Sequence, residues 1–153
     1  MNTSPIIIID DDDDDLDLIK QAFAELKVTN DVLIFNNGDA FLEYMRATER
    51  GTFFILCDFN MAKISGLELK RRIYDDERLR LKCVPFIFIF TSRASASIMG
   101  AYSFGVQGYF IKPSNYEGLK GLLQRIMLYW SDSQHPNCLT EQLFRAPLFS
   151  LPP

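Results

Sequence analysis

The sequence predicts an α/β fold built on a doubly wound, five-stranded parallel sheet with helices on both faces. Five apolar runs have the length of strands, and they are continuous rather than alternating, as strands buried on both faces should be. These runs are Ile6–Ile9, Val32–Phe35, Phe53–Cys57, Phe86–Phe90 and Tyr109–Ile111. Helical patterns lie between them, and alternation of strands with helices favours a parallel sheet with right-handed crossovers.

The helices expected between these strands are defined by apolar residues three or four apart, which share one face of a helix. The first two stripes are Leu16, Ile19, Phe23 and Leu26, followed by Phe41, Tyr44 and Met45. A third helix is expected at Ser65–Asp76 and a fourth at Ser95–Phe104, where Gly100 and several serines weaken the pattern. The last helix has the longest stripe, formed by Leu119, Leu122, Leu123, Ile126, Met127 and Trp130.

Length, charge and cysteine content exclude several classes of protein. The 153 residues, 48% of them hydrophobic, are enough for one core and too few for two ordinary domains, and a net charge of −4 argues against nonspecific binding to nucleic acid or a membrane. No secretory signal or membrane span is expected. Three widely spaced cysteines, Cys57, Cys83 and Cys138, favour a reduced, cytoplasmic protein. The only histidine, His135, is expected at the surface, which argues against a catalytic triad.

Six consecutive aspartates, Asp10 to Asp15, directly follow the first strand. Adjacent carboxylates repel one another, so the run is costly unless a positive charge occupies it. Asp13, Asp14 and Asp15 fall where a helix should begin, and there the exposed N–H groups and the helix dipole stabilise them. Asp10 and Asp11 are therefore the pair that needs a functional explanation, and a cation site is the one we expect.

Polar residues also interrupt the other strand ends. Asp58 follows the third strand, Thr91 and Ser92 the fourth, and Lys112 the fifth. In a doubly wound sheet the carboxyl ends of the strands meet at one edge, where ligands bind. Several carboxylates suit Mg²⁺, while a hydroxyl and an ammonium suit a phosphoryl group. The pattern indicates phosphoryl transfer with an aspartate as a candidate nucleophile, and these residue types leave open which aspartate is attacked.

Four motifs in order resemble the receiver domain of bacterial response regulators. They are Ile6 to Asp12, Leu56 to Met61 with Gly66 beyond it, Phe88 to Ser92, and Gly108 to Pro113. The resemblance covers roughly residues 5–131 and implies a flavodoxin-like strand order of 2-1-3-4-5. It implies a receiver domain over residues 1–131, followed by a tail over residues 132–153 that is too short for an output domain.

The resemblance also implies a role for each site residue. Asp58 corresponds to the phosphoacceptor, which takes its phosphoryl group from a histidine kinase or a phosphotransfer protein. Asp10 and Asp11 correspond to the pair that holds Mg²⁺ together with Asp58 and the backbone carbonyl of Asn60. Thr91 and Lys112 correspond to the groups that contact the phosphoryl oxygens, and Tyr109 to an aromatic switch residue. The Lys112–Pro113 bond resembles a cis peptide of the family.

Two positions depart from the family pattern. Ala62 stands where proline is usual, and Ser65 stands where aspartate is usual. Both lie in the loop after the third strand, and neither removes a group that does chemistry, so phosphorylation is expected to survive. By the same resemblance, Asn60 and Arg93 occupy positions that in the family tend to tune the lifetime of the phosphoryl group, in a direction that the sequence does not give.

A stand-alone receiver is expected to have no enzymatic activity except assisting its own phosphorylation and dephosphorylation. It is expected to act by contacting an unknown downstream protein. Its apolar tail either covers the domain or forms a homodimer or partner interface. One rival interpretation is a haloacid-dehalogenase-type phosphatase using Asp10, although the chain has no further acidic pair beyond Lys112. The second rival is a receiver-like binding module that is never phosphorylated.

Overall fold

The computed structural model describes residues 3–91 and 95–134, and the predicted sheet lies within them. Its strands are β1 (Ile6–Ile9), β2 (Val32–Phe35), β3 (Ile55–Asp58), β4 (Phe86–Phe90) and β5 (Gly108–Ile111). All neighbouring pairs are parallel and the order is β2-β1-β3-β4-β5, which confirms the predicted fold class and strand order. Ser92, Arg93 and the tail beyond Gln134, with His135 and Cys138, lie outside the described residues.

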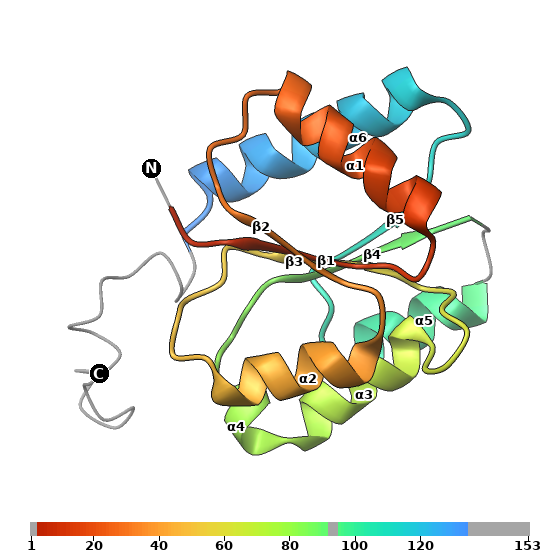
Figure 1. Ribbon diagram of the computed structural model, residues 1–153. Coiled ribbons are helices and arrows are strands. Elements are labelled where there is room, and N and C mark those ends of the chain that lie inside the picture. The colour runs from red at the N-terminus through yellow and green to blue at the C-terminus, as the bar shows by residue number, and fades with distance from the viewer. Residues whose placement is uncertain (1–2, 92–94, 135–153) are drawn as a thin grey trace.

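Helices cover both faces of the sheet (Figure 1). They are α1 (Asp13–Glu25), α2 (Gly38–Ala47), α3 (Gly66–Asp75), α4 (Glu77–Arg80), α5 (Ser95–Ser103) and α6 (Tyr116–Asp132). Helices α1 and α6 pack on one face, and α2, α3 and α5 on the other. None of the helices in the described part of the chain is both long and apolar enough to cross a membrane.

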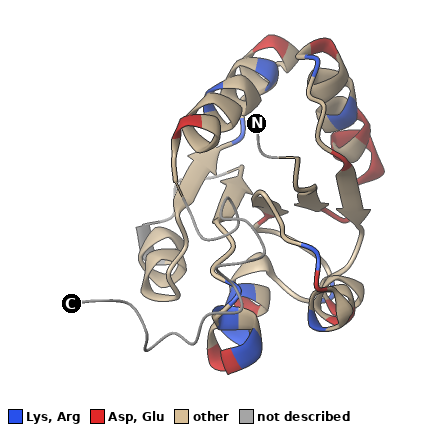
Figure 2. Cartoon of the chain, turned by 90° about the vertical axis from the view of Figure 1, so that its left-hand side faces the viewer, with Lys and Arg blue, Asp and Glu red and all other residues tan. Residues whose placement is uncertain are grey.

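The continuous apolar runs serve two separate cores. Ile7 and Ile9 of β1 pack with α2 and α3, while Ile6 and Ile8 pack with α1 and α6. Because successive side chains of a strand point to opposite faces, a strand covered on both sides must be apolar at every position. Figure 2 shows the complementary pattern, in which charged residues lie mainly on the helices and at the strand ends.

Side-chain caps explain where the helices begin. The capping residues are Asp12 for α1, Asn37 for α2, Ser65 for α3, Asp76 for α4 and Asn115 for α6. Each of these side chains accepts a hydrogen bond from a backbone N–H of the first turn, which otherwise lacks a partner within its helix. The predicted helix start within the aspartate run is therefore confirmed, with Asp12 as the cap and Asp13 as the first helical residue.

Apart from shifts of one residue at the ends of β5, α3 and α5, three details differ from the sequence analysis. Strand β3 begins at Ile55 rather than Phe53 and includes Asp58, although Phe53 is buried. Helix α4 was not predicted because only Leu79 of its four residues is buried, which leaves no apolar repeat to detect. The described residues contain no cis peptide bond, so the expectation for Lys112–Pro113 is wrong.

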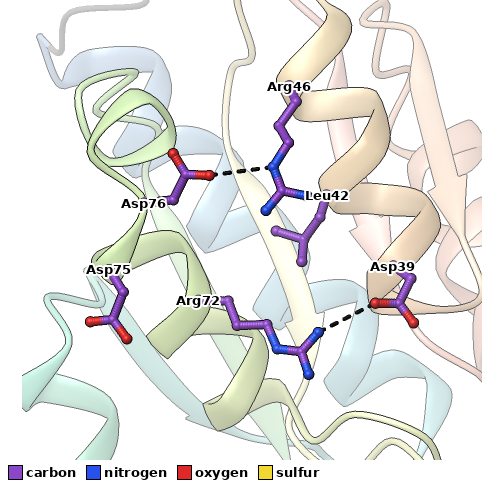
Figure 3. A pocket seen from close by; sticks show the side chains of 6 residues that line it. All are labelled: Asp39, Leu42, Arg46, Arg72, Asp75 and Asp76. Atoms are coloured by element: carbon purple, nitrogen blue, oxygen red, sulfur yellow. Dashed lines mark hydrogen bonds and ion pairs between the residues drawn. The ribbon is translucent and has the colours of Figure 1, made fainter.

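An open, charged groove of about 490 Å³ lies between α2 and α3 (Figure 3). Its charged groups already pair with one another: Arg46 Nε lies 3.3 Å from Asp76 Oδ2, and Arg72 Nη1 lies 3.4 Å from Asp39 Oδ1. These pairs are largely exposed, so each contributes little to stability. Asp75, the remaining charged residue of the groove, pairs with Arg71, so each of the described charged groups here already has a partner.

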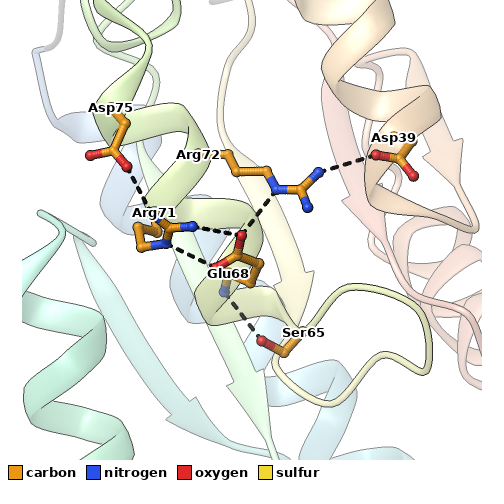
Figure 4. A network of polar contacts seen from close by, with 6 residues as sticks. All are labelled: Asp39, Ser65, Glu68, Arg71, Arg72 and Asp75. Atoms are coloured by element: carbon orange, nitrogen blue, oxygen red, sulfur yellow. Dashed lines mark hydrogen bonds and ion pairs between the residues drawn. The ribbon is translucent and has the colours of Figure 1, made fainter.

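The ion pairs continue along the surface of α3 (Figure 4). Glu68 accepts hydrogen bonds from Arg71 Nε at 2.9 Å and from Arg72 Nε at 3.1 Å, and Arg71 Nη1 also contacts Asp75 at 3.1 Å. These hydrogen bonds lower the pKa of Glu68 to about 2. The network holds the exposed face of α3, whose first residue packs against the end of β3.

Candidate functional site

Three carboxylates meet at the carboxyl edge of the sheet. Asp10 and Asp11 follow β1, and Asp58 is the last residue of β3. Because β1 and β3 are neighbours in parallel register, with Ile9 opposite Cys57, their ends lie side by side. One carboxylate oxygen from each aspartate lies within 4.8 Å of the others. This cluster of oxygens suits a hard divalent cation such as Mg²⁺.

Backbone N–H groups orient the carboxylates. Asp10 Oδ1 accepts a hydrogen bond of 2.9 Å from the N–H of Asp12, and Asp11 Oδ2 accepts one of 2.7 Å from the N–H of Ala62. A proline at position 62 would have no N–H to donate. The departure from the family pattern at Ala62 therefore adds a donor that ties the β3–α3 loop to Asp11.

Repulsion and burial raise the affinity of the site for protons. Burial, followed by the negative charges of Asp10 and Asp11, raises the pKa of Asp58 to about 7. Burial also raises the pKa of Asp10, which is only 5% exposed, although the N–H of Asp12 and the charge of Lys112 oppose this. Burial raises the pKa of the neighbouring Cys57 thiol well above its usual range. A bound cation would remove the repulsion between the carboxylates.

The raised pKa of Asp58 predicts a pH dependence of stability. The folded chain binds this proton more tightly than the unfolded chain, so the contribution of Asp58 is full below the unfolded pKa and is lost as the pH rises through about 7. Without divalent cations, we expect the urea midpoint to fall between about pH 5 and about pH 8, with a smaller fall in Asp58→Asn.

Added Mg²⁺ provides the control for this prediction. A cation that binds the folded chain stabilises it, and it binds more strongly once Asp58 has lost its proton. The midpoint should therefore recover more at about pH 8 than at about pH 5. Parallel pH profiles of wild type and Asp58→Asn in EDTA would contradict the assignment of the slope to Asp58.

Lys112 approaches the cluster from β5. Its backbone N–H donates to the Phe90 carbonyl at 2.7 Å, which extends the β4–β5 pairing by one residue. Its side chain lines a small cavity together with Asp10 and Asp58. The ammonium forms an ion pair with Asp15 in the first turn of α1. The sequence analysis placed Asp15 only at a helix start and missed this contact, because no spacing rule relates two residues almost a hundred positions apart.

The two predicted switch residues lie in different surroundings. Thr91 is exposed at the end of β4. The Tyr109 ring, in β5, lies 5.8 Å from the rings of Phe59 and Phe90, measured between centroids, and its buried hydroxyl has no hydrogen-bond partner among the described residues. Burial raises the pKa of this hydroxyl. Tyr109 thus packs inward here, and its movement with Thr91 remains a prediction.

Comparison with known proteins places the whole arrangement in context. Residues 6–124 match the family described as response regulator receiver domain. A relative in Methanothrix harundinacea, the probable methanogenesis regulatory protein FilR2, is 34% identical over 117 residues, which cover 74% of this chain and 74% of that protein.

Solved structures agree with the strand order and the helical layers. The phosphorylated cyanobacterial phytochrome response regulator RcpA is 25% identical, with a TM-score of 0.75 over 86% of this chain and 96% of RcpA. The receiver domain of the sensor histidine kinase PA1611 from Pseudomonas aeruginosa, solved with a magnesium ion in its active site cleft, is 21% identical, with a TM-score of 0.68 over 85% of this chain and 98% of that domain.

Proposed function

Because this chain belongs to the response regulator receiver domain family, we propose that it receives a phosphoryl group on Asp58 and passes the signal on by changing a protein-binding surface. Receiver domains act in two-component signalling, and the donor is a histidine kinase or a phosphotransfer protein. The observation that carries the proposal is the convergence of Asp10, Asp11 and Asp58 within 4.8 Å, beside a cavity that Lys112 also lines.

Each residue of the site has a distinct part in the proposed transfer. A carboxylate oxygen of Asp58 attacks the phosphorus, a new O–P bond forms, and the bond between phosphorus and the donor breaks with its electron pair leaving on the donor. Lys112 and the Thr91 hydroxyl face the transferred oxygens. Asp10, Asp11, Asp58 and the Asn60 carbonyl would hold Mg²⁺, which when bound neutralises charge on the carboxylates and the phosphoryl oxygens.

The output is a change in the surface formed by α5, β5 and α6. In the proposed switch, the phosphoryl group draws Thr91 inward and Tyr109 changes its packing against Phe59 and Phe90. The same proposal divides the chain into a receiver over residues 1–131 and a tail over residues 132–153. It also includes a cytoplasmic location and the formation of a homodimer through the tail. The chain has no catalytic role beyond its own phosphorylation and dephosphorylation.

Phosphoryl uptake tests the proposal directly. The chain is incubated with acetyl phosphate and Mg²⁺, and its intact mass is measured before and after. We expect a gain of one phosphoryl mass that EDTA prevents and that alkaline hydroxylamine removes, because hydroxylamine cleaves acyl phosphates. No gain in mass at saturating donor and Mg²⁺ would contradict the proposal. It would favour the rival interpretation of a receiver-like binding module that is never phosphorylated.

The ion pair between Lys112 and Asp15 predicts a gain in phosphorylation rate. Asp15 competes with the phosphoryl group for the ammonium of Lys112, so Asp15→Asn should free that ammonium. We expect uptake from acetyl phosphate to become about fivefold faster at saturating Mg²⁺, since a partly exposed ion pair contributes on the order of 1 kcal/mol. Asp17→Asn is the matched control, because Asp17 pairs with Lys20 on the exposed side of the same helix. Equal rates for both variants would contradict the competition.

A further inference from the structure

Lys70 is a buried cation at the opposite edge of the sheet. It lies on the apolar side of α3 beside Leu69 and Ile73, and it is only 8% exposed. No carboxylate pairs with it in the described parts of the chain, and the group found near its ammonium is the ring of Phe86, whose centroid lies 5.2 Å away. Buried ammonium groups are normally paired, because leaving water without a partner is costly. Lys70 therefore has no carboxylate counter-ion among the described residues.

The side chain of Lys70 borders an apolar pocket of about 260 Å³. Ile55 and Phe86, the first residues of β3 and β4, are buried beside it, so the pocket lies at the end of the strands away from Asp58. Phe41, Met45 and Phe104 add walls from α2 and from the residue after α5. A ligand here would meet aromatic and aliphatic surface around the buried Lys70, and the exposed Arg80 also lines the pocket.

Two other polar side chains of the pocket, Arg80 and Gln107, already have hydrogen-bond partners. Arg80 Nη1 donates to the Tyr74 carbonyl at 2.5 Å. Gln107 accepts from the N–H of Phe86 at 2.7 Å and donates to the Gly105 carbonyl at 2.8 Å. Lys70 is thus the buried cation of the pocket and has no anionic partner among the described residues, and burial alone lowers its pKa, to about 8. A ligand carboxylate would reverse this shift.

We infer that this pocket binds a small arylalkyl carboxylate, with its ring against the partly exposed Phe104 and its carboxylate paired with Lys70. The one buried ammonium suits a monoanion, because the second cation of the pocket, Arg80, is exposed and already donates to the Tyr74 carbonyl. The volume of about 260 Å³ suits a ligand with one ring and a short acidic chain. This site is separate from the proposed phosphoryl site and goes beyond it.

The test compares a charged probe with its uncharged counterpart. 3-Phenylpropionate and 3-phenylpropionamide have nearly the same shape, and both are titrated into the full chain while backbone amide resonances are followed by NMR. We expect the acid to shift the resonances of Phe86, Gly105 and Gln107, and to bind about tenfold or more tightly than the amide. Lys70→Met should remove this preference, and Lys70→Arg should retain it. Asp58→Asn should leave it unchanged, so a failure of this inference is distinct from a failure of phosphorylation.

Three outcomes would overturn the inference. One is equal binding of acid and amide to the wild-type chain, and another is the absence of shifts around the pocket at millimolar probe. The third is a change in the resonances of residues 135–153 caused by Lys70→Met alone, which would show that the chain's own end segment occupies the pocket. Urea unfolding of each variant verifies that it is folded before the comparison is made.

Discussion

Asp58→Asn is expected to abolish the phosphoryl uptake of the chain. The asparagine amide keeps the size of the side chain but has no carboxylate oxygen to attack phosphorus, so no acyl phosphate can form. We expect the intact mass to remain unchanged after incubation with acetyl phosphate and Mg²⁺. The variant should also be at least as stable as wild type above about pH 7, because it removes a carboxylate that Asp10 and Asp11 repel. Loss of uptake would then not reflect unfolding.

Asp14→Asn is the matched control for this experiment. Asp14 is an exposed residue in the first turn of α1, and its carboxylate is not among those that meet at the strand ends. Its replacement should leave uptake within about twofold of wild type, because it changes only a solvated charge near the helix start. Full uptake by Asp58→Asn would mean that a different carboxylate is attacked, with Asp10 and Asp11 as the next candidates.

The largest expected loss of stability comes from Gly66→Ala. A methyl group at Gly66 would lie 2.7 Å from the Asp58 carbonyl oxygen, 2.7 Å from Phe88 Cε1 and 3.0 Å from Phe59 Cα. Two of these atoms belong to the backbone and the third to a buried ring, so none can move aside cheaply. We expect the free energy of unfolding to fall by about 3 kcal/mol, at the upper end for overpacking. Because the end of β3 must shift, Mg²⁺ affinity should weaken as well.

Gly121→Ala provides a control with the opposite sign. Gly121 lies inside α6, and an added methyl group would meet only Arg125 Nη1, at an ordinary contact distance of 3.5 Å. Alanine favours a helix over glycine by about 1 kcal/mol, so this variant should be more stable than wild type. Urea denaturation measures both changes. A similar loss in the two variants would show that the close packing at Gly66 is not the cause.

Much of the fold follows from short-range patterns in the sequence. Continuous apolar runs mark strands that are covered on both sides, and the six-aspartate run marks the turn from β1 into α1. These features depend on neighbouring residues, so periodicity reveals them. Helix α4 lacks such a pattern, since its single buried residue, Leu79, gives no repeat. The start of β3 was placed too early because Phe53 and Phe54 are buried without belonging to the strand.

The part of the site that could be predicted is the set of residues at the carboxyl ends of the strands, because a parallel sheet brings these ends together. Asp10, Asp11 and Asp58 were expected at one edge, and the structure places them there. Contacts between a side chain and a distant backbone or helix were missed, as for the Ala62 N–H on Asp11 and for Asp15 on Lys112. They depend on loop conformation and helix rotation, which no local pattern encodes. Lys70 was not predicted as a site residue for a related reason. Lysine is usually exposed, so its burial on the apolar side of α3 is not evident from the sequence.

The burial of Cys57 makes local opening of the central strand measurable by thiol labelling. This residue is fully buried next to Asp58, and its thiol donates to the Asp58 carbonyl oxygen at 3.2 Å. A thiol reagent can reach it only when β3 separates from its neighbours, whereas Cys83 is exposed and should be modified at once. The labelling rate of Cys57 would therefore report how often the central strand opens. A cation that binds the carboxylates of Asp10, Asp11 and Asp58 should slow that rate.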